Sequence, residues 1–380
     1  RNGIAVGVAT KTNALLDQLV YHELPALAQS LGDITYAPLK GFSHYPCLRK
    51  VNRFVKEGVK MVDVQGTEHS QAPSLGALLS FIDQTDYDDM DSLKMDYRVV
   101  PRRAVTTTSH DCLRRKCPFY GTTCFVHGAR RFAETADVVV TNHTLLFCDA
   151  AADNGLLPPV RHWILDEAHG AEAEARRAFS LEIAAEDVTR LAQKVASGES
   201  RNVYARAERK LSSSLKNDGA TLFEGLIGKA KSAGDMFAAA THEFAPHIKD
   251  LLYFDPNKRS RNYDRTELWL NDDIRASETF GSLRTLAKAM QASAEKAITC
   301  SQELVGYLEN IEGAAEPQRE IASVAMDLKD LVGAVEVIFG EKSDSYAYAA
   351  ELCRKKDKQT DKLEALLVNE GEALEDKLYS

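Results

Sequence analysis

Three short apolar segments in the first half of the chain end in polar residues, and this pattern constrains the fold more than any other feature. The segments are IAVGVAT (Ile4 to Thr10), DVVVTNH (Asp137 to His143) and HWILDEAH (His162 to His169). Apolar, β-branched runs of this length are typical of strands that are buried on both faces. The sequence therefore predicts three buried strands.

The segment after the first strand, NALLDQLVYHELPALAQSL, has helical spacing, with Leu15, Leu19 and Leu27 on one face. A strand, a helix and later strands predict a parallel α/β sheet. In such sheets ligands bind beside the carboxyl ends of the strands. The polar residues expected at that edge are Thr10, Thr12, Asn142, His143, Asp166 and Glu167.

The second half of the chain, from Glu182 onward, has a helical pattern. Apolar residues recur there at intervals of three, four or seven, in two runs separated by the sequence EGAAEPQ. The runs are Leu283, Leu286, Met290, Ala297, Cys300, Leu304 and Ile311, then Ile321, Val324, Leu328, Leu331, Val335 and Ile338. This spacing predicts a long antiparallel helical hairpin, in which Met290 and Cys300 serve packing and bind no cofactor.

Three of the seven cysteines fall within thirteen residues, CLRRKCPFYGTTC, from Cys112 to Cys124. An odd number of cysteines with a tight group indicates metal ligation in a reducing compartment rather than a disulfide framework. Zinc is one candidate, with His110 or His127 as a further ligand. Zinc ligands are more often separated by two to four residues, and the chain has no C-x-x-C pair. Cysteines without any ligand role are the remaining alternative.

Charge is distributed unevenly along the chain. The formal net charge is -9, yet the segment from Met95 to Arg131 holds eight basic residues against two acidic ones. The basic residues are Arg98, Arg102, Arg103, Arg114, Arg115, Lys116, Arg130 and Arg131. A basic patch on an acidic chain favours nucleic-acid binding, although a solvated basic face has the same composition.

Aromatic residues lie among these cations, at Phe119, Tyr120 and Phe125. Aromatic rings beside cations suit single-stranded DNA, whose bases stack while its phosphates pair with Arg. Packing inside a small domain is the alternative for the rings. The acidic stretch DQTDYDDMD, from Asp83 to Asp91, is expected to be a solvated loop.

The tetrapeptide DEAH, Asp166 to His169, is the most specific signal for chemistry. At the end of a strand, the first carboxylate can hold Mg²⁺ through its water shell. The second can orient or deprotonate the water that attacks a γ-phosphate. The alternative is an acidic helix start, with both carboxylates near the positive end of the helix dipole.

The chain also lacks features of membrane and secreted proteins. No apolar run approaches the roughly 18 residues of a membrane span, and the first thirty residues have no signal-peptide pattern. We therefore expect a cytoplasmic protein that does not associate with a membrane.

Five motifs in order resemble the DinG branch of the XPD-like superfamily 2 DNA helicases. They are VATKTNALLDQL, LKGFSHYPCLRK, the three clustered cysteines, ADVVVTNHTLLF and WILDEAH, and they span about the first 180 residues. The resemblance implies an α/β fold, a partial RecA-like P-loop NTPase motor domain with an inserted iron-sulfur domain, followed by a mainly helical arch domain. The expected boundaries are 1–40 and 131–179 for the motor domain with its DEAH box, 41–130 for the iron-sulfur domain and 180–380 for the arch.

The same resemblance implies a [4Fe-4S] cluster. Its ligands would be Cys47, from LKGFSHYPC, and Cys112, Cys117 and Cys124, with 64, 4 and 6 residues between them. Pro118 follows Cys117 as proline follows a ligand in ferredoxin-type runs. The cluster would staple a small domain rather than perform redox catalysis, and it would place the neighbouring cations beside a DNA strand. The cations are Arg114, Arg115 and Lys116, and the cysteines that match no ligand position are Cys148, Cys300 and Cys353.

The other site residues follow from the same motif match. Asp166 would hold Mg²⁺ through water, Glu167 would act on the attacking water with ATP as substrate, and His169 would link the nucleotide state to a second motor domain. The residues expected to contact DNA, or to couple it to the ATP site, are Thr10, Thr12, Asn142 and His143. Asn142 and His143 could also simply cap the sheet.

Two departures from the family pattern limit this expectation. The chain has no G-x-x-x-x-G-K-[ST] phosphate loop, and its nearest candidate, GLIGKA from Gly225 to Ala230, has the wrong spacing. It also has no Q-x-x-G-R-x-x-R motif. The family places the first before the position of Arg1 and the second after Ser380. We therefore expect an internal fragment that does not hydrolyse ATP by itself.

The expected function of the complete protein is an ATP-dependent DNA helicase that moves 5' to 3' on single-stranded DNA. Its partners would be single-stranded DNA and forked or structured duplexes, in DNA repair. It would act as a monomer in the bacterial cytoplasm, associated with the nucleoid. Two alternatives remain: an ATPase-inactive module that binds single-stranded DNA, and a zinc-stapled interaction protein.

Overall fold

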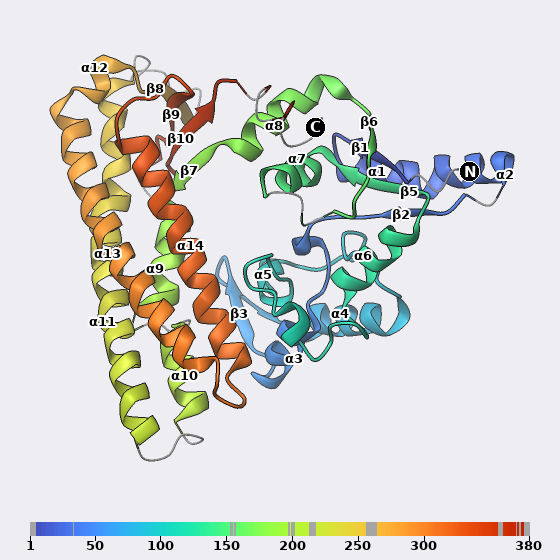
Figure 1. Ribbon diagram of the computed structural model, residues 1–380, viewed down its shortest axis with the longest axis horizontal. Coiled ribbons are helices and arrows are strands. Elements are labelled where there is room, and N and C mark those ends of the chain that lie inside the picture. Colours follow the sequence, from blue (N-terminus) through green and yellow to red (C-terminus); the bar gives the residue numbers. More distant parts are fainter. Residues whose placement is uncertain are drawn as a thin grey trace. The chain divides into compact units, whose positions relative to one another are not determined.

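The computed structural model divides the chain into two compact units. Unit 1 is Arg1–Phe179 with Glu370–Ser380, and unit 2 is Ser180–Asn369. Figure 1 shows the elements of each unit in the colours of the sequence. The structure describes all residues except 1–4, 33, 153, 154, 156, 197, 199–201, 213–217, 256–263, 356–359, 370, 372, 373 and 376–380.

Unit 1 is built on a four-stranded sheet in the order β2-β5-β1-β6, and every pairing in it is parallel. This confirms the predicted parallel α/β sheet. Ile4, the expected start of the first strand, lies outside the described residues. The strands are β1 (Val6–Thr10), β2 (Tyr36–Pro38), β5 (Val138–Asn142) and β6 (His162–Leu165).

Strand β6 departs from the expectation of a buried strand. It is the outer strand of the sheet, and Ile164 is 56% exposed. Its inward contact is made by Trp163, which lies opposite Gly7 of β1. A Cβ atom on Gly7 would come within 2.3 Å of the Trp163 ring, so this pairing requires glycine.

The helical segment after β1 forms α1 (Asn13–Gln18), a π-helical turn η1 (Leu19–Glu23) and α2 (Leu24–Leu31). Of the leucines placed on one face by the helical spacing, Leu19 is partly buried and Leu27 is exposed. The buried side chains are Leu16, Val20 and Leu24, because these pack on Val140 of β5.

Between β2 and β5 the chain leaves the sheet. We call residues 41–130 the insert and residues 5–40 with 131–179 the sheet region. The insert has a small core of its own, made by Val51, Leu78, Met90, Val100 and Val105. Its elements are η2 (Phe42–His44), α3 (Leu48–Lys56), β3 (Met61–Val64), β4 (Thr67–Ser70), α4 (Ala72–Gln84), α5 (Arg102–Val105), η3 (Arg114–Lys116) and the start of α6 (Phe125–Thr135).

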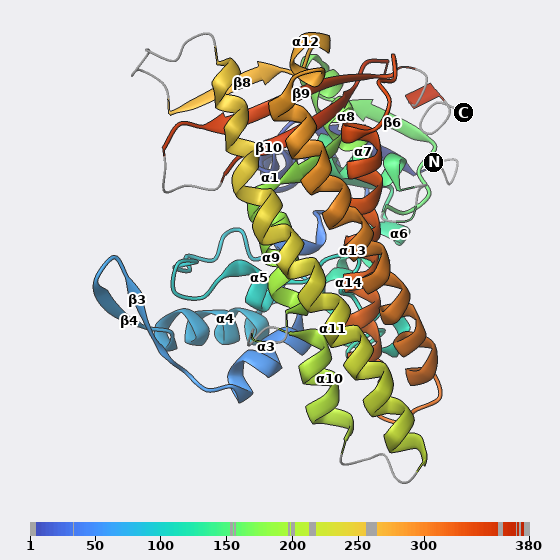
Figure 2. The same ribbon diagram turned by 90° about the vertical axis from the view of Figure 1, so that its left-hand side faces the viewer.

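Strands β3 and β4 form an antiparallel hairpin that extends away from α3 and α4 (Figure 2). After β5 the sheet region continues through α7 (His143–Ala151), β6, η4 (Ala168–Gly170) and α8 (Ala171–Phe179). Among the described residues, no helix is long and apolar enough to span a membrane.

Unit 2 contains the predicted helical hairpin. Gln318 Nε2 donates to the Val305 carbonyl (3.1 Å) and Gln291 Nε2 to Glu336 Oε1 (3.3 Å), so α13 and α14 run antiparallel. Figures 1 and 2 show α11 beside them. The helices are α9 (Ala185–Val195), α10 (Val203–Leu211), α11 (Asp218–His247), η5 (Ile248–Phe254), α12 (Asp272–Arg275), α13 (Glu278–Leu308) and α14 (Ala315–Phe339).

The antiparallel sheet of unit 2 was not predicted. Its strands follow the order β7-β10-β9-β8, with bounds Leu181–Ala184, Lys362–Leu367, Tyr346–Cys353 and Arg265–Trp269. The mainly helical prediction for residues 180–380 is therefore incomplete. Ile311, expected on the first helix of the hairpin, lies in the turn after α13. The sequence GLIGKA lies inside α11 and forms no loop.

Candidate functional site

The carboxyl ends of β1, β5 and β6 lie side by side. Thr10 pairs with Asn142 across the sheet, and Ala9 pairs with Leu165. The Asp166 N–H donates to the Ala9 carbonyl (2.9 Å), which continues the ladder by one residue. The structure therefore brings the predicted polar residues of three strands to one edge.

The turn after β6 exposes both predicted carboxylates, Asp166 and Glu167. Glu167 has φ 54° and ψ 41°, in the left-handed region. A residue other than glycine held there costs on the order of 1–3 kcal/mol, and such strain is concentrated at functional sites.

A chain of contacts runs from β1 to this carboxylate. Lys11 Nζ lies 3.3 Å from His169 Nε2, and His169 Nδ1 lies 3.2 Å from Glu167 Oε2. An ammonium group can only donate, so Nε2 accepts and Nδ1 carries the proton toward Glu167. The methylene groups of Lys11 pass close to Gly170, where a Cβ atom would lie 3.1 Å from them. Lys11 was not among the predicted site residues, although it stands between Thr10 and Thr12.

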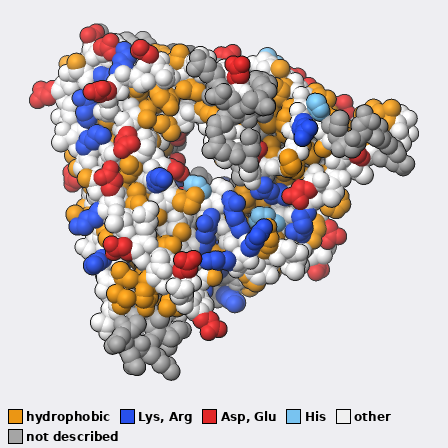
Figure 3. All heavy atoms as spheres, viewed as in Figure 1, with side chains coloured by type: hydrophobic (Ala, Val, Ile, Leu, Met, Phe, Trp, Pro, Cys, Tyr) orange, Lys and Arg blue, Asp and Glu red, His pale blue; other side chains and the backbone are white. Residues whose placement is uncertain are grey.

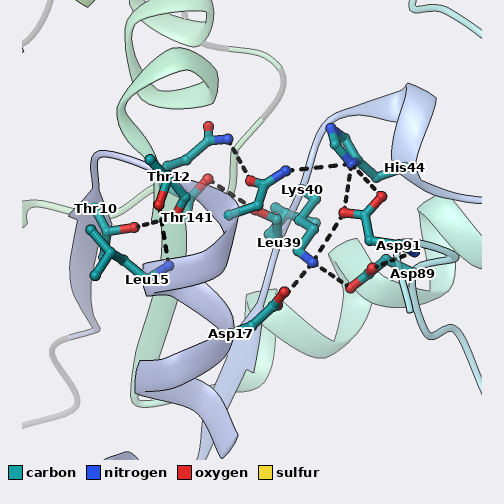
Figure 4. Close-up of polar contacts among 12 residues, drawn as sticks. Thr10, Thr12, Leu15, Asp17, Leu39, Lys40, His44, Asp89, Asp91 and Thr141 are labelled. Carbon is teal, nitrogen blue, oxygen red and sulfur yellow. Dashed lines mark hydrogen bonds and ion pairs between the residues drawn. The ribbon is translucent and has the colours of Figure 1, made fainter.

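The two threonines after β1 have different surroundings. Thr10 is fully buried, and its hydroxyl donates to the Thr12 carbonyl (2.9 Å). Thr12 is exposed, and its hydroxyl accepts from the Leu15 N–H (3.3 Å) at the start of α1. Figure 4 shows both contacts. Thr12 can meet a ligand, whereas Thr10 shapes the turn that presents it.

The residues after β5 also differ. Asn142 caps α7 by accepting from the Leu145 N–H (2.8 Å), and it donates to Asn13 Oδ1 (2.7 Å). His143 is fully buried, with both ring nitrogens lacking a hydrogen-bond partner, and it packs near Phe147. His143, expected to contact DNA, therefore presents no polar atom to a ligand in this structure.

The four predicted cysteine ligands come from separate segments of the insert. Cys47 precedes α3, Cys117 follows η3, Cys124 precedes α6, and Cys112 lies in the turn before η3. Burial, and after it the thiols of Cys112, Cys47 and Cys117, raise the pKa of Cys124 to about 11. Burial is likewise the main cause that raises the pKa of Cys112, with Cys47 and Cys117 adding to it. The fold therefore gathers the four thiols near one another.

A single metal ion has no prepared site in the described part of the chain, where no three His, Cys, Asp or Glu side chains are grouped to hold one. His127, a possible zinc ligand, places Nε2 3.5 Å from Cys112 Sγ. Burial and three neighbouring arginines lower the pKa of His127 to about 4. Four gathered thiols form the usual donor set of a [4Fe-4S] cluster, which is larger than one ion, so these residues fit that group.

The predicted cations Arg114, Arg115 and Lys116 form η3 and are exposed between Cys112 and Cys117. Four more cations lie on α3 directly after Cys47, in the sequence LRKVNRFVK. Lys and Arg side chains gather on the face of the insert seen in Figure 3. The sequence analysis did not identify the α3 cations, although they follow the proposed ligand Cys47 in the same way that the η3 cations follow Cys112. They are Arg49, Lys50, Arg53 and Lys56.

Of the three aromatic residues expected near DNA, Phe125 belongs to the core. It is 4% exposed and stacks on Phe81 with ring centroids 6.3 Å apart. Tyr120 lies beside His127, with centroids 4.5 Å apart, and both Tyr120 and Phe119 are half-buried. A stacking role for Phe125 is therefore wrong, because α6 turns its ring inward.

Comparison with known proteins adds relatives to this geometry. The chain is 36% identical over 208 residues to the ATP-dependent helicase DinG of Mycobacterium tuberculosis, an alignment that covers 49% of this chain and 31% of that protein. It is 33% identical over 199 residues to the ATP-dependent DNA helicase YoaA of Escherichia coli, covering 50% of this chain and 29% of YoaA. No protein-family profile matches the chain.

A longer alignment exists with the 3'-5' exonuclease DinG of Bacillus subtilis. It is 25% identical over 389 residues and covers 98% of this chain and 39% of that protein. The chain thus matches 29% to 39% of the length of these three relatives.

A parallel α/β sheet with a DEAH turn at its ligand edge, together with these relatives, relates the chain to ATP-dependent DNA helicases. More narrowly, the chain is a relative of the DinG and YoaA helicases, which confirms the resemblance seen in its motifs.

Proposed function

We propose that the protein works as an ATP-dependent helicase that moves 5' to 3' along single-stranded DNA and opens forked or structured duplexes. We further propose that it acts as a monomer in the bacterial cytoplasm, at the nucleoid. The observation that carries the proposal is the DEAH turn, which lies beside the end of β1, at the same edge of the sheet as the end of β5, in a chain related to helicases.

In this proposal the residues 1–40 and 131–179 form the first motor domain, 41–130 the iron-sulfur domain and 180–380 the arch. The 380 residues contain neither a phosphate loop nor the arginine motif of a second motor domain. We propose that segments outside these residues supply both. This chain alone would then hold ATP too weakly to turn it over.

The carboxylates of the DEAH turn have separate roles. Asp166, exposed at the end of β6, would hold the water shell of Mg²⁺. Glu167 would orient or deprotonate the attacking water, and its contact with His169 would keep its side chain in place. His169 would pass the nucleotide state on to the second motor domain.

Cys47, Cys112, Cys117 and Cys124 would hold a [4Fe-4S] cluster. When bound, the cluster supplies covalent links between the two ends of the insert and takes no part in hydrolysis. The supporting observation is that burial, and then the neighbouring thiols of Cys47 and Cys117, raise the pKa of Cys112 and of Cys124, which a cationic group would reverse. Zinc is the competing outcome.

The DNA strand would pass over the insert and the sheet edge. The exposed cations of η3, with Lys56 of α3, would pair with phosphates, and Thr12 and Asn142 would meet the strand at the edge. Thr10 and His143, which are buried, would support these contacts rather than make them.

The catalytic test is Glu167→Gln in the full-length protein. The amide cannot take a proton, so DNA-stimulated ATP turnover should fall at least about 100-fold while ATP and DNA binding persist. An equal loss of ATP binding would contradict the role given to Glu167.

The DNA path is tested by Arg114→Glu, Arg115→Glu and Lys116→Glu together. Each lost phosphate contact removes about 0.7 from the salt slope for single strands, so the slope should flatten by about 2. A control with the same charge change uses three exposed lysines of unit 2, Lys229, Lys296 and Lys342. Equal weakening by both triple variants would reduce the effect to net charge and remove η3 from the path.

A further inference from the structure

A buried cation lies where the chain enters the insert. The side chain of Lys40 is 1% exposed, and Nζ lies 2.8 Å from Asp17 Oδ1, 3.0 Å from Asp89 Oδ2 and 3.2 Å from Asp91 Oδ2. Burial opposes the charge, but hydrogen bonds and attraction to Asp17 and Asp89 outweigh it and raise the pKa of Lys40 to about 12. All three ammonium N–H groups thus face carboxylates.

This arrangement corrects the expectation of a solvated acidic loop. Asp89 and Asp91 belong to the stretch from Asp83 to Asp91, and their side chains are 11% and 21% exposed. Lys40 holds both inward. Asp83, Asp86 and Asp88 remain exposed, so only part of the stretch is a solvated face.

Asp91 also contacts two further residues of the insert, one early in its sequence and one later. His44 Nδ1 lies 2.8 Å from Asp91 Oδ2, and the Arg102 guanidinium forms an ion pair with Asp91 Oδ1. Arg102 Nε donates to the Ser43 carbonyl (2.8 Å). Arg102 begins α5, which leads toward Cys112, while His44 leads toward Cys47. The Asp91 carboxylate therefore contacts both the segment that leads to Cys47 and the segment that leads to Cys112, which carry proposed cluster ligands.

The other side of this contact is α1 of the sheet region. Asn13 and Asp17 are four residues apart, so they share one face of the helix. Asp17 pairs with Lys40, and Asn13 Nδ2 lies 3.5 Å from His44 Nδ1. The two partners, Lys40 and His44, are also four residues apart in the sequence. Figure 4 shows Asp17 and Lys40 pointing toward each other, with Thr12 at the opposite end of α1. The same Asn13 accepts from Asn142 at the sheet edge (2.7 Å).

Stability alone does not explain these charges. Apolar residues of similar volume often stabilise a buried contact as well as, or better than, an ion cluster, because the charges must lose their hydration. Buried ion clusters have a second consequence: their fixed donors and acceptors specify one arrangement of the segments that meet there. Here they fix α1 against both ends of the insert.

We propose that the Lys40 cluster, formed by Asp17, Lys40, His44, Asp89, Asp91 and Arg102, transmits movement of α1 to the insert during duplex opening. Lys40 and Asp91 are then positioning residues: they touch neither ATP nor DNA, and they keep the insert in register with the helix whose first turn meets the strand. This role rests on the proposed helicase function.

The experiment compares variants of the full-length protein. Lys40→Met alone leaves three carboxylates around an apolar side chain and can unfold the insert. The main variant therefore combines Lys40→Met with Asp17→Asn and Asp89→Asn, which removes the ion pair to α1 and leaves the pair of Asp91 and Arg102 and the contact of Asn13 with His44. The control is Arg206→Met with Glu320→Gln, an ion pair of unit 2 with side chains 31% and 14% exposed.

Three quantities are measured: DNA-stimulated ATP hydrolysis, unwinding of a forked duplex, and amide hydrogen exchange in residues 40–46 and 85–92. In the main variant, duplexes opened per ATP hydrolysed should fall about tenfold or more, while hydrolysis stays within about threefold of wild type. Exchange should quicken in both segments, with iron content unchanged. The control should leave the ratio and these segments as in wild type.

Two results would overturn the role. If exchange quickens and the ratio of unwinding to hydrolysis stays at the wild-type value, the cluster is an anchor without a part in coupling. If exchange does not change, the link does not hold these segments at all. A wild-type enzyme that hydrolyses no ATP and opens no duplex would instead overturn the proposed function, and this role with it.

Discussion

The insert and unit 2 are held together in different ways. The insert packs five fully or nearly fully buried apolar side chains in its own core and adds gathered thiols, with the ion cluster around Lys40 at its entry. Unit 2 has one apolar core that runs from β7 to β10. Five of its phenylalanines are at most 2% exposed: Phe223, Phe237, Phe244, Phe280 and Phe339.

This difference follows from size. A segment of about ninety residues with irregular loops buries too little apolar surface for a wide stability margin, so bound groups and specific polar contacts matter more. A bundle of long helices buries a continuous stripe and tolerates the loss of any one polar contact. We therefore expect the insert to respond to changes in ligands and charges, and unit 2 to respond to changes in packing.

The largest effect is expected from Cys117→Ser. Protein purified without oxygen should carry about four irons per chain, and the variant should lose them. Because metal binding contributes folding energy directly, amide exchange in residues 42–131 should quicken by at least about 100-fold while α13 and α14 keep their protection.

The matched control for that ligand is Cys148→Ser, which removes a thiol outside the four predicted ligands. It should keep the iron and the protection of the insert. Stoichiometric zinc in place of iron, in protein handled without oxygen, would contradict the cluster and favour the zinc alternative.

The next effect should fall on unit 2. Phe280 is fully buried and stacks on Phe339 with ring centroids 5.5 Å apart. Phe280→Ala leaves a cavity, so the free energy of unfolding of unit 2 should fall by about 3–5 kcal/mol. Hydrogen exchange in α13 and α14 should report the loss.

Leu222→Ala serves as the control for this cavity, because Leu222 is 55% exposed. It should change the unfolding free energy by less than about 0.5 kcal/mol. If Phe280→Ala released the iron of the insert as readily as it loosened α13, the two regions would not be separate in their energetics.

The same difference decides how much the sequence could predict. Local periodicity predicts the helices α13 and α14 and the strand β5. In the helices one stripe of apolar residues faces the core, and in the strand one continuous apolar run does so. Strands β7 and β10 pair with each other although more than 170 residues separate them in the sequence. Strand β9, YAYAAELC, contains several alanines and no run of large apolar residues. No local pattern marks such partners.

The site was predictable where motifs carry it. The edge formed by Thr12, Asn142 and Asp166 follows from strand ends alone. The partners of charged residues did not follow, because Asp91 meets Lys40 across fifty intervening residues. Charges find their partners through the tertiary fold, which composition does not encode.

A smaller effect tests the charges at the entry of the insert through pH. The Asp91 carboxylate faces Lys40, His44 and Arg102 and lies near Asp89. Burial opposes its charge, but hydrogen bonds from His44 and Arg102 outweigh burial and lower the pKa of Asp91 well below its ordinary value. Its contribution to stability is therefore complete above pH about 4 and is lost as pH falls through the lower folded pKa.

Asp91→Asn should lower the stability of the insert by about 1–3 kcal/mol near neutral pH, measured by amide exchange in residues 85–92. The difference from wild type should stay constant above pH about 4 and shrink in stronger acid. Lys40 has the opposite sign: its pKa is raised to about 12, so its contribution is lost only as pH rises through that value. Asp88→Asn, an exposed neighbour, should show no such difference.

The smallest effect is expected for a surface charge of unit 2. On α9, Arg190 Nη1 lies 2.7 Å from Glu186 Oε1, one helical turn away, with side chains 36% and 59% exposed. Exposed pairs at this spacing contribute about 0.3–0.5 kcal/mol, and Arg190 keeps Asp187 as a second partner. Glu186→Ala should therefore lower the unfolding free energy of unit 2 by at most about 0.5 kcal/mol, and the difference should vanish near about 1 M salt. Urea unfolding at low and high salt measures it. A loss above about 1 kcal/mol that persists in salt would mean that unit 2 depends on its charges as the insert does, and the contrast between the two regions would fail.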